Sequence, residues 1–276
     1  MIKSIYILMI CSGILLVSCV PEKKLARNFV NNTPNTSFFI LSPDIVFKES
    51  VKPVKDTAVI NPTQRQLDSL AFLESDFIRY IPDSMFFALY LPELRKEFEK
   101  LGLNVNFDTL PHDFSRDSAG NAYVFDFAQI QLQEFVDVYY DTETFAGKRY
   151  FKEHSLNGLY LNTWVEFQKI NGQGNKPMVL FTELSVKDEL HGFFHQNQLS
   201  GQVKYSYKID ELDLDDVKNW IKKAGQIHAR YLYDFLMNQY IKVSMKEKEM
   251  KPKYYLHYDR KNDQFVPVDE KRFVPQ

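Results

Sequence analysis

The sequence predicts an α/β (α+β) fold, in which amphipathic helices pack on a mixed, mainly antiparallel sheet. Residues 84–107 show a helical stripe, a glycine and then an alternating strand, and residues 149–209 follow a β pattern. Residues 214–241 repeat apolar side chains at helical spacing. These three stretches place a single α/β domain at residues 37–245.

The first elements of this domain are an interrupted strand and a helix. Residues 37–47 form the strand, which Pro43 interrupts. Thr63 is suited to cap the helix, whose apolar stripe runs through Leu67 and Leu70 as far as Ile78.

A second helix and a strand complete the first half of the domain. The helix is expected to begin at residues 82–84, and Gly102 suits the left-handed conformation that ends it. Residues 103–107 then alternate as a half-buried strand. Residues 122–140 fit a strand and a helix about equally well, so only their start is assigned to a strand.

The β region is expected to form antiparallel hairpins. Residues 159–170 and 178–186 flank the turn sequence NGQGNK at 171–176. The strand at 203–209 pairs across a second turn at 196–201.

The last helix begins at Asp213, and Asp216 completes a capping box. Its stripe continues to about Ile241, so the helix is about 40 Å long. His228 lies on this stripe and is expected to be a buried, hydrogen-bonded core residue. Residues 246–276 form a charged C-terminal extension that can make a small hairpin from 254–258 and 264–268.

The N-terminus predicts an export signal. Lys3 precedes an apolar run from Ile5 to Val17, which is too short for a membrane span of about 20 residues. The end of this run and the two residues after it, Leu16-Val17-Ser18-Cys19, resemble the lipobox of bacterial lipoproteins. The resemblance implies that residues 1–18 are a removed signal peptide and that Cys19 carries lipid, with palmitate as an expected acyl chain. Residues 19–36 would then be a lipidated tether.

Composition excludes several classes of function. The other cysteine, Cys11, lies in the signal, so no disulfide, thiol catalysis or cysteine metal site is expected. With a net charge of −2, the chain is not expected to have the basic surface that nucleic-acid binding requires. No cofactor motif appears, since the GQGNK sequence lacks the spacing of a phosphate-binding loop.

His191 and His195 are weak candidates for metal ligands or catalysis. Four-residue spacing places both imidazoles on one side of a helix, where they can grip a metal. In the strand that the surroundings favour, they lie about 13 Å apart, which is too far for one ion. Ordinary surface histidines are the favoured interpretation.

A repeated Asp-Ser/Thr-aliphatic triplet exceeds chance and resembles the O-glycosylation sequon of Bacteroidota-type bacteria. The resemblance implies modification, best at the loop positions Thr57, Thr109 and Ser118. The alternative is that these triplets only mark turns and helix caps.

Two hypotheses for function follow. The first is a non-catalytic lipoprotein of Bacteroidota type, anchored to the periplasmic face of the outer membrane, that binds or scaffolds a protein or glycan partner. The alternative is a periplasmic hydrolase of envelope polymers, which uses carboxylates such as Asp126 and Glu134 with His191 or His195. A deep cleft with converging carboxylates favours the enzyme, and a shallow apolar patch favours the binder.

Overall fold

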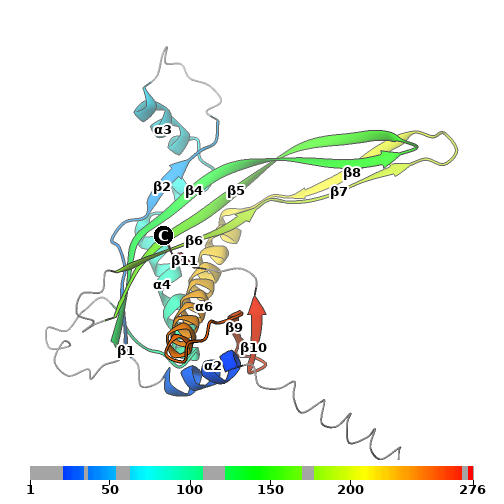
Figure 1. Ribbon diagram of the computed structural model, residues 1–276. Coiled ribbons are helices and arrows are strands. Elements are labelled where there is room, and N and C mark those ends of the chain that lie inside the picture. The colour runs from blue at the N-terminus through cyan, green and yellow to red at the C-terminus, as the bar shows by residue number, and fades with distance from the viewer. Residues whose placement is uncertain are drawn as a thin grey trace, which may run out of the picture.

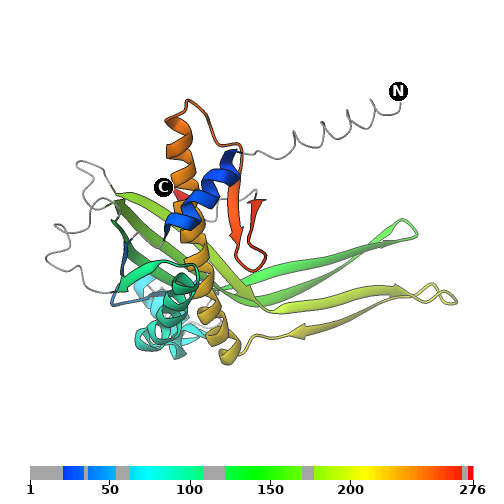
Figure 2. The ribbon, with the colours of Figure 1, turned by 90° about the horizontal axis from the view of Figure 1, so that it is seen from below.

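The computed structural model of the chain describes residues 21–33, 37–53, 63–107, 122–169, 177–268 and 273–275. It confirms the predicted fold class: helices pack on a mixed, mostly antiparallel sheet (Figures 1 and 2). The helical elements are α2 (Pro21–Asn32), α3 (Gln64–Leu73), the 3-10 turn η2 (Ile78–Tyr80), α4 (Asp83–Lys100) and α6 (Leu214–Lys246). The strands are β1 (Ser37–Leu41), β2 (Phe47–Ser50), β3 (Asn104–Phe107), β4 (Ala122–Phe145), β5 (Lys148–Lys169), β6 (Met178–Lys187), β7 (Glu189–Gln196), β8 (Val203–Asp210), β9 (Tyr255–Asp259), β10 (Gln264–Val268) and β11 (Val274–Pro275).

The main sheet has the order β11-β6-β5-β4-β1-β3, and β2 also pairs with β4. The long strands β4, β5 and β6 are antiparallel neighbours, whereas β1 and β2 run parallel to β4. The predicted first strand is therefore two strands, β1 and β2, on the two sides of Pro43. Strands β7 and β8 form a separate two-stranded sheet, as do β9 and β10.

Helices α4 and α6 pack together against one face of the main sheet (Figure 2). The buried side chains of α4 are spaced by four residues: Phe86, Tyr90, Leu94 and Phe98. Gly102 ends the following turn with φ +80°, which is the left-handed conformation expected there. Among the described residues, no helix combines the length and the apolarity needed to cross a bilayer.

Both predicted helix caps are present. Thr63 and Gln66 form a capping box at α3, and Asp213 and Asp216 form one at α6. The stripe predicted as far as Ile78 is not one helix, because α3 ends at Leu73. Three N–H groups of residues 76–78 instead donate to the carboxylate of Glu134 on β4, so these residues are bound to the sheet.

His228 is a buried core residue, as its place on the apolar stripe predicts. Its Nδ1 lies 2.6 Å from the hydroxyl of Tyr90 on α4, and its ring is fully buried. Burial lowers the pKa of His228 to about 3. The imidazole is therefore neutral in the folded protein throughout the physiological range.

This burial predicts that His228 makes folding sensitive to acid. In the unfolded state the histidine has a pKa of about 6.5. Below that pH its imidazole is protonated in the unfolded state, whereas the buried imidazole of the native state stays neutral. Stability is therefore lost as the pH falls from about 6.5 towards 3, by about 1.4 kcal/mol per pH unit. We expect the difference in unfolding free energy between wild type and His228→Asn to shrink by about 2 kcal/mol between pH 6.5 and pH 5 in urea titrations. A difference that does not change with pH would show that His228 is protonated or exposed in the native state.

The predicted tether at residues 19–36 is wrong for residues 21–33. Pro21–Asn32 form α2, which packs across the C-terminal half of α6 (Figure 2). Ala26 is fully buried against Met237 and Ile241, and the carboxylate of Glu22 accepts a hydrogen bond from the backbone N–H of Lys253. The composition of this segment is polar on average, but one side of α2 carries an apolar stripe that packs against α6.

The small terminal hairpin is confirmed. Strands β9 and β10 pair in antiparallel register around residues 260–263. Asp234 of α6, which is 1% exposed, accepts the backbone N–H of Tyr258, and Asn238 exchanges two hydrogen bonds with the backbone of Leu256. The hairpin is thus part of the packed body and not a free extension.

Candidate functional site

Two β-hairpins leave the body together and form a long arm (Figures 1 and 2). We define the arm as residues 136–157, the outer parts of β4 and β5, and residues 189–210, the hairpin β7–β8. Pairing of β2 with β4 ends at Glu134, and pairing of β6 with β5 ends at Gly158. Beyond these points each hairpin continues as a two-stranded ribbon.

Asp188 fixes the point where the two hairpins separate. It interrupts the strand between β6 and β7 and is 4% exposed. One carboxylate oxygen accepts the N–H of Asn157 at 2.7 Å, and the other accepts the N–H of Leu212 at 2.8 Å. A single side chain therefore joins β5, the start of β7 and the chain that enters α6, and it gives the arm a fixed base.

The inner faces of the two hairpins contact each other through aromatic and polar side chains. The hydroxyl of Tyr205 donates to Asp141 at 3.0 Å and lies 3.1 Å from Nε2 of His154. Partial burial raises the pKa of Tyr205 to about 12, and the hydrogen bond to Asp141 adds to the rise. Tyr150 and Phe194 meet nearer the tips. The hairpins therefore form one two-layered arm.

Gly192 allows this contact between the hairpins. A Cβ at this position would lie 2.0 Å from the hydroxyl of Tyr205 and 3.0 Å from a carboxylate oxygen of Asp141. A larger residue would displace the tyrosine that bridges the two layers.

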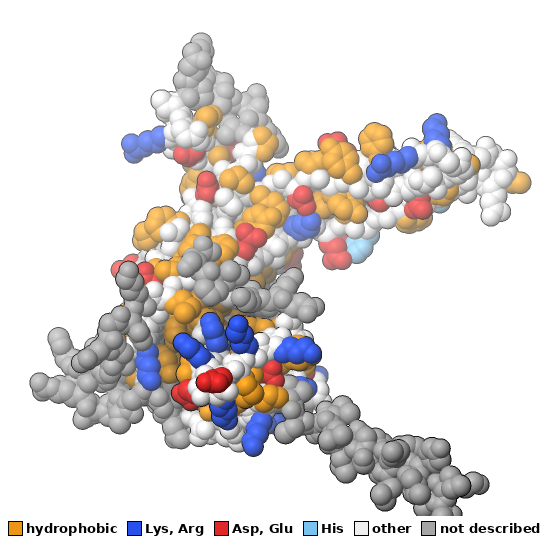
Figure 3. Space-filling model, viewed as in Figure 1, with side chains coloured by type: hydrophobic (Ala, Val, Ile, Leu, Met, Phe, Trp, Pro, Cys, Tyr) orange, Lys and Arg blue, Asp and Glu red, His pale blue; other side chains and the backbone are white. Residues whose placement is uncertain are grey.

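The outer surfaces of the arm expose large apolar side chains (Figure 3). Phe151 is 67% exposed on the ribbon β4–β5, and Phe193 is 61% exposed on the ribbon β7–β8. Val138, Tyr140 and Leu199 are also exposed on the arm, and so are Tyr139 and Tyr207, although the strand register places these two on the inner faces. Because soluble monomers rarely expose apolar side chains in such a series, this surface is the candidate binding site.

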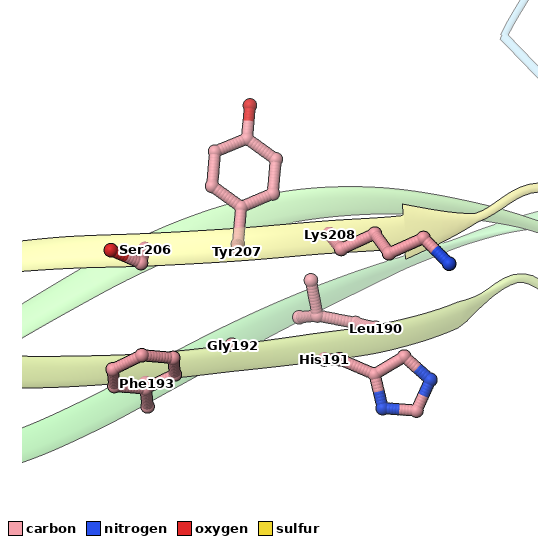
Figure 4. Close-up of a pocket in the computed structure, with 7 residues that line it drawn as sticks. All are labelled: Leu190, His191, Gly192, Phe193, Ser206, Tyr207 and Lys208. Carbon is pink, nitrogen blue, oxygen red and sulfur yellow. The ribbon is translucent and has the colours of Figure 1, made fainter.

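A shallow depression lies on the ribbon β7–β8 (Figure 4). Its volume is about 580 Å³. Gly192, which has no side chain, and the small Ser206 line it, and Tyr207 projects away from the strands beside it (Figure 4). Its walls come from one hairpin alone, so it is an open surface feature of the arm.

His191 and His195 lie on β7, and both point to the outer face of the hairpin. Nε2 of His191 lies 3.3 Å from Asp210 and 3.6 Å from Glu189, and its side chain is 55% exposed. The structure thus brings His191 next to two carboxylates but not next to His195. In the described part of the chain, no three His, Cys, Asp or Glu side chains, these included, are arranged so that they could hold a metal ion together.

The other predicted site residues are Cys19, Thr57, Thr109 and Ser118, and all lie outside the described residues. Lipidation and glycosylation at these positions stay predictions.

The buried carboxylates of the described residues serve as backbone acceptors. Glu134, Asp188 and Asp234 each accept N–H groups from other segments of the chain. Glu134, a candidate acid for the hydrolase, therefore holds residues 76–78 against the sheet. Asp126 is half-buried and lies opposite Glu166 on the neighbouring strand.

Sequence reasoning identified the β7–β8 hairpin but missed the arm as a site. The usable signal was the concentration of aromatic residues among polar ones at 138–154 and 193–207. No model of a known protein family matches the chain, and no curated protein is significantly similar to it. The function is therefore inferred from the residues and their geometry.

Proposed function

We propose that this protein is a lipid-anchored, non-catalytic binding protein of the bacterial cell envelope, and that its arm binds a partner protein. The observation that supports this proposal most strongly is the series of exposed aromatic side chains on a two-layered projection. Aromatic residues are enriched in the energetically dominant parts of protein interfaces. The arm offers an extended surface of this kind, whereas a small-molecule substrate is usually held in a more enclosed site.

The position of α2 supports a role in which the arm points away from the anchor. Pro21, two residues after Cys19, begins α2, which packs near the C-terminal end of α6. The arm begins at the other end of α6, where Asp188 holds Leu212. Because α6 has 33 residues, about 50 Å separate these ends. A membrane that holds Cys19 would thus leave the arm free to reach a partner, on the periplasmic face of the outer membrane in our proposal.

This proposal is tested by site-specific crosslinking of the full-length protein in its native envelope. A photo-crosslinker replaces Tyr140, which is 54% exposed on the arm. We expect the double change Phe151→Ser and Phe193→Ser to reduce the crosslinked partner by about tenfold, because both rings lose their contacts. The matched control is Leu73→Ser, since Leu73 is 61% exposed on α3 and lies outside the arm.

The anchor is tested in the same cells, where Cys19→Ser should move the protein from the membrane to the soluble fraction. Equal crosslinking in the arm variant and the wild type would show that the arm does not bind the partner. Loss of turnover of an envelope polymer in the Glu189→Gln and His191→Ala variants would support the hydrolase instead.

A further inference from the structure

Among the described residues, the edge of β4 that faces away from β5 is paired in its first half, with β1 at residues 122–126 and with β2 further along. β2 pairs with residues 131–134 of this edge, and the last hydrogen bond runs from the N–H of Val51 to the carbonyl of Glu134 at 2.9 Å. In the described part of the chain, no strand pairs with the edge from residue 136 to residue 144. An established strand interface therefore continues as a bare edge along the arm (Figure 1).

The hydrogen bond at Glu134 shows which backbone groups this bare edge presents. The register of β4 with β5 is regular from Gln129 to Phe145. In an antiparallel ribbon, the N–H and C=O of one residue point to the same side, and successive residues alternate. The even-numbered residues therefore direct their backbone groups outwards, as Glu134 does: Val136, Val138, Tyr140, Thr142 and Thr144.

We infer that the partner protein adds an extended segment to this edge as a β-strand. The inference rests on the proposed function and gives it a binding mode. Strand addition supplies affinity through main-chain hydrogen bonds and specificity through alternate side chains. Val138 and Tyr140, which are 47% and 54% exposed, lie on the outer face beside the edge and would contact apolar side chains of the added strand.

The opposite edge of the ribbon is less suited to strand addition. Along β5 the arm carries Lys148, Arg149 and Lys152, which are all exposed. Lysine and other charged side chains are a common protection of edges against pairing. Residues 136–144 contain no lysine, arginine, proline or glycine.

Charge identifies the chemistry of the added strand and argues against a second copy of this chain. The inner face beside the edge carries Asp141 and Glu143, and also Asp137, which is ion-paired with Lys187 at 2.6 Å. If two copies of this chain paired their β4 edges about a two-fold axis at residue 141, Asp141 would lie opposite Asp141 of the other copy. An axis at residue 142 would place Asp141 opposite Glu143, so both registers bring like charges together. A strand that alternates basic and apolar residues fits both faces, with its basic residues beside Asp141 and Glu143.

Thr142→Pro tests the inference without breaking the arm. The N–H of Thr142 points away from β5, so proline removes an outward donor and leaves the ladder with β5 intact. We expect about a tenfold loss of the partner crosslinked at Tyr140. The matched control, Thr142→Val, keeps the N–H and should crosslink as the wild type does. Circular dichroism and thermal unfolding establish that both variants are folded.

Hydrogen exchange on the purified full-length protein tests the geometry independently of the partner. The amides of Val138, Tyr140 and Thr142 should exchange fast, and those of Tyr139 and Asp141 should be protected. Protection of all five amides in the free protein would overturn the inference, because the edge would already be paired. Full crosslinking in Thr142→Pro would also overturn it. If the Phe151 and Phe193 changes still abolish capture in that case, the proposed function stands and only the strand addition fails.

Discussion

Replacing Glu134 with alanine is expected to lower the free energy of unfolding by about 3–5 kcal/mol. Glu134 is fully buried, and its carboxylate accepts the N–H groups of Asp76, Phe77 and Ile78 at 2.7, 3.0 and 3.2 Å. Its Oε1 also lies 2.7 Å from the ammonium of Lys52. Alanine would leave three backbone donors without their acceptor, and each unsatisfied buried donor costs about 1–3 kcal/mol before relaxation.

The lysine adds to this cost. Burial lowers the pKa of Lys52, but its hydrogen bonds with Asp76 and Glu134 outweigh burial and the pKa is raised, so the side chain is charged. Without Glu134, a mostly buried ammonium keeps only the half-exposed Asp76 as its partner. Removal of one member of a buried ion pair is costly for this reason.

Urea unfolding at neutral pH measures the effect, with Glu143→Ala as the matched control. Glu143 is an exposed acid on the same strand, so its loss should change stability by less than about 0.5 kcal/mol. Glu134→Gln should fall between the two, because its amide keeps one acceptor oxygen but turns a donor towards the backbone donors. A loss below about 1 kcal/mol in Glu134→Ala would mean that water or neighbouring groups replace the carboxylate.

Elements with local signals could be predicted from the sequence. The capping boxes at Thr63 and Asp213 need only residues three positions apart, and the left-handed end at Gly102 needs only a glycine. The antiparallel pairings of β5 with β6 and of β7 with β8 were predicted from the turn residues between these strands, although the turn predicted at 171–176 itself lies outside the described residues. These features were correct because few distant contacts decide them.

The long strand β4 was ambiguous for a physical reason. The register shifts between Asp126 and Gln129, so the buried positions change from odd to even numbers along the strand. Phe125 and Phe127 are buried before the shift, and Ile130 and Leu132 are buried after it. A β period interrupted in this way resembles helical spacing. Beyond residue 136 the strand enters the arm, where no core face imposes a pattern.

The tether and the acid cluster depend on distant partners. The apolar stripe of α2 is short, and it is buried because α6 and the β9–β10 hairpin cover it. These partner elements lie about two hundred residues later in the sequence, so the local sequence of α2 does not reveal them. Glu134 looks like any exposed acid in the sequence, because the donors that surround it belong to residues 76–78. The departure of β7 from the sheet likewise depends on Asp188 binding both Asn157 and Leu212.

Gly225 should be the residue of α6 least tolerant of a larger side chain. A Cβ there would lie 2.5 Å from the carbonyl oxygen of Tyr90 and 3.1 Å from the backbone nitrogen of Leu94. Both atoms belong to the backbone of α4. That helix cannot easily move, because the side chains of Tyr90 and Leu94 are fully buried and Tyr90 is bonded to His228.

Two effects of a substitution at Gly225 have opposite signs, and their sizes decide the result. Helix propensity favours alanine over glycine by about 1 kcal/mol in a helix interior. Overpacking against rigid neighbours costs about 1–3 kcal/mol and sometimes more. At 2.5 Å from a backbone oxygen the clash should win, so we expect Gly225→Ala to destabilise the protein and Gly225→Val to cost about 3 kcal/mol or more.

Urea unfolding of the two variants, with Asn219→Ala as the control, separates these effects. Asn219 is exposed on the same helix, so its replacement reports helix propensity alone and should be neutral or slightly stabilising. The graded loss from alanine to valine at Gly225 would locate the cost in the contact between the helices. A gain of about 1 kcal/mol in Gly225→Ala would instead show that propensity governs this position and that α4 and α6 have room between them.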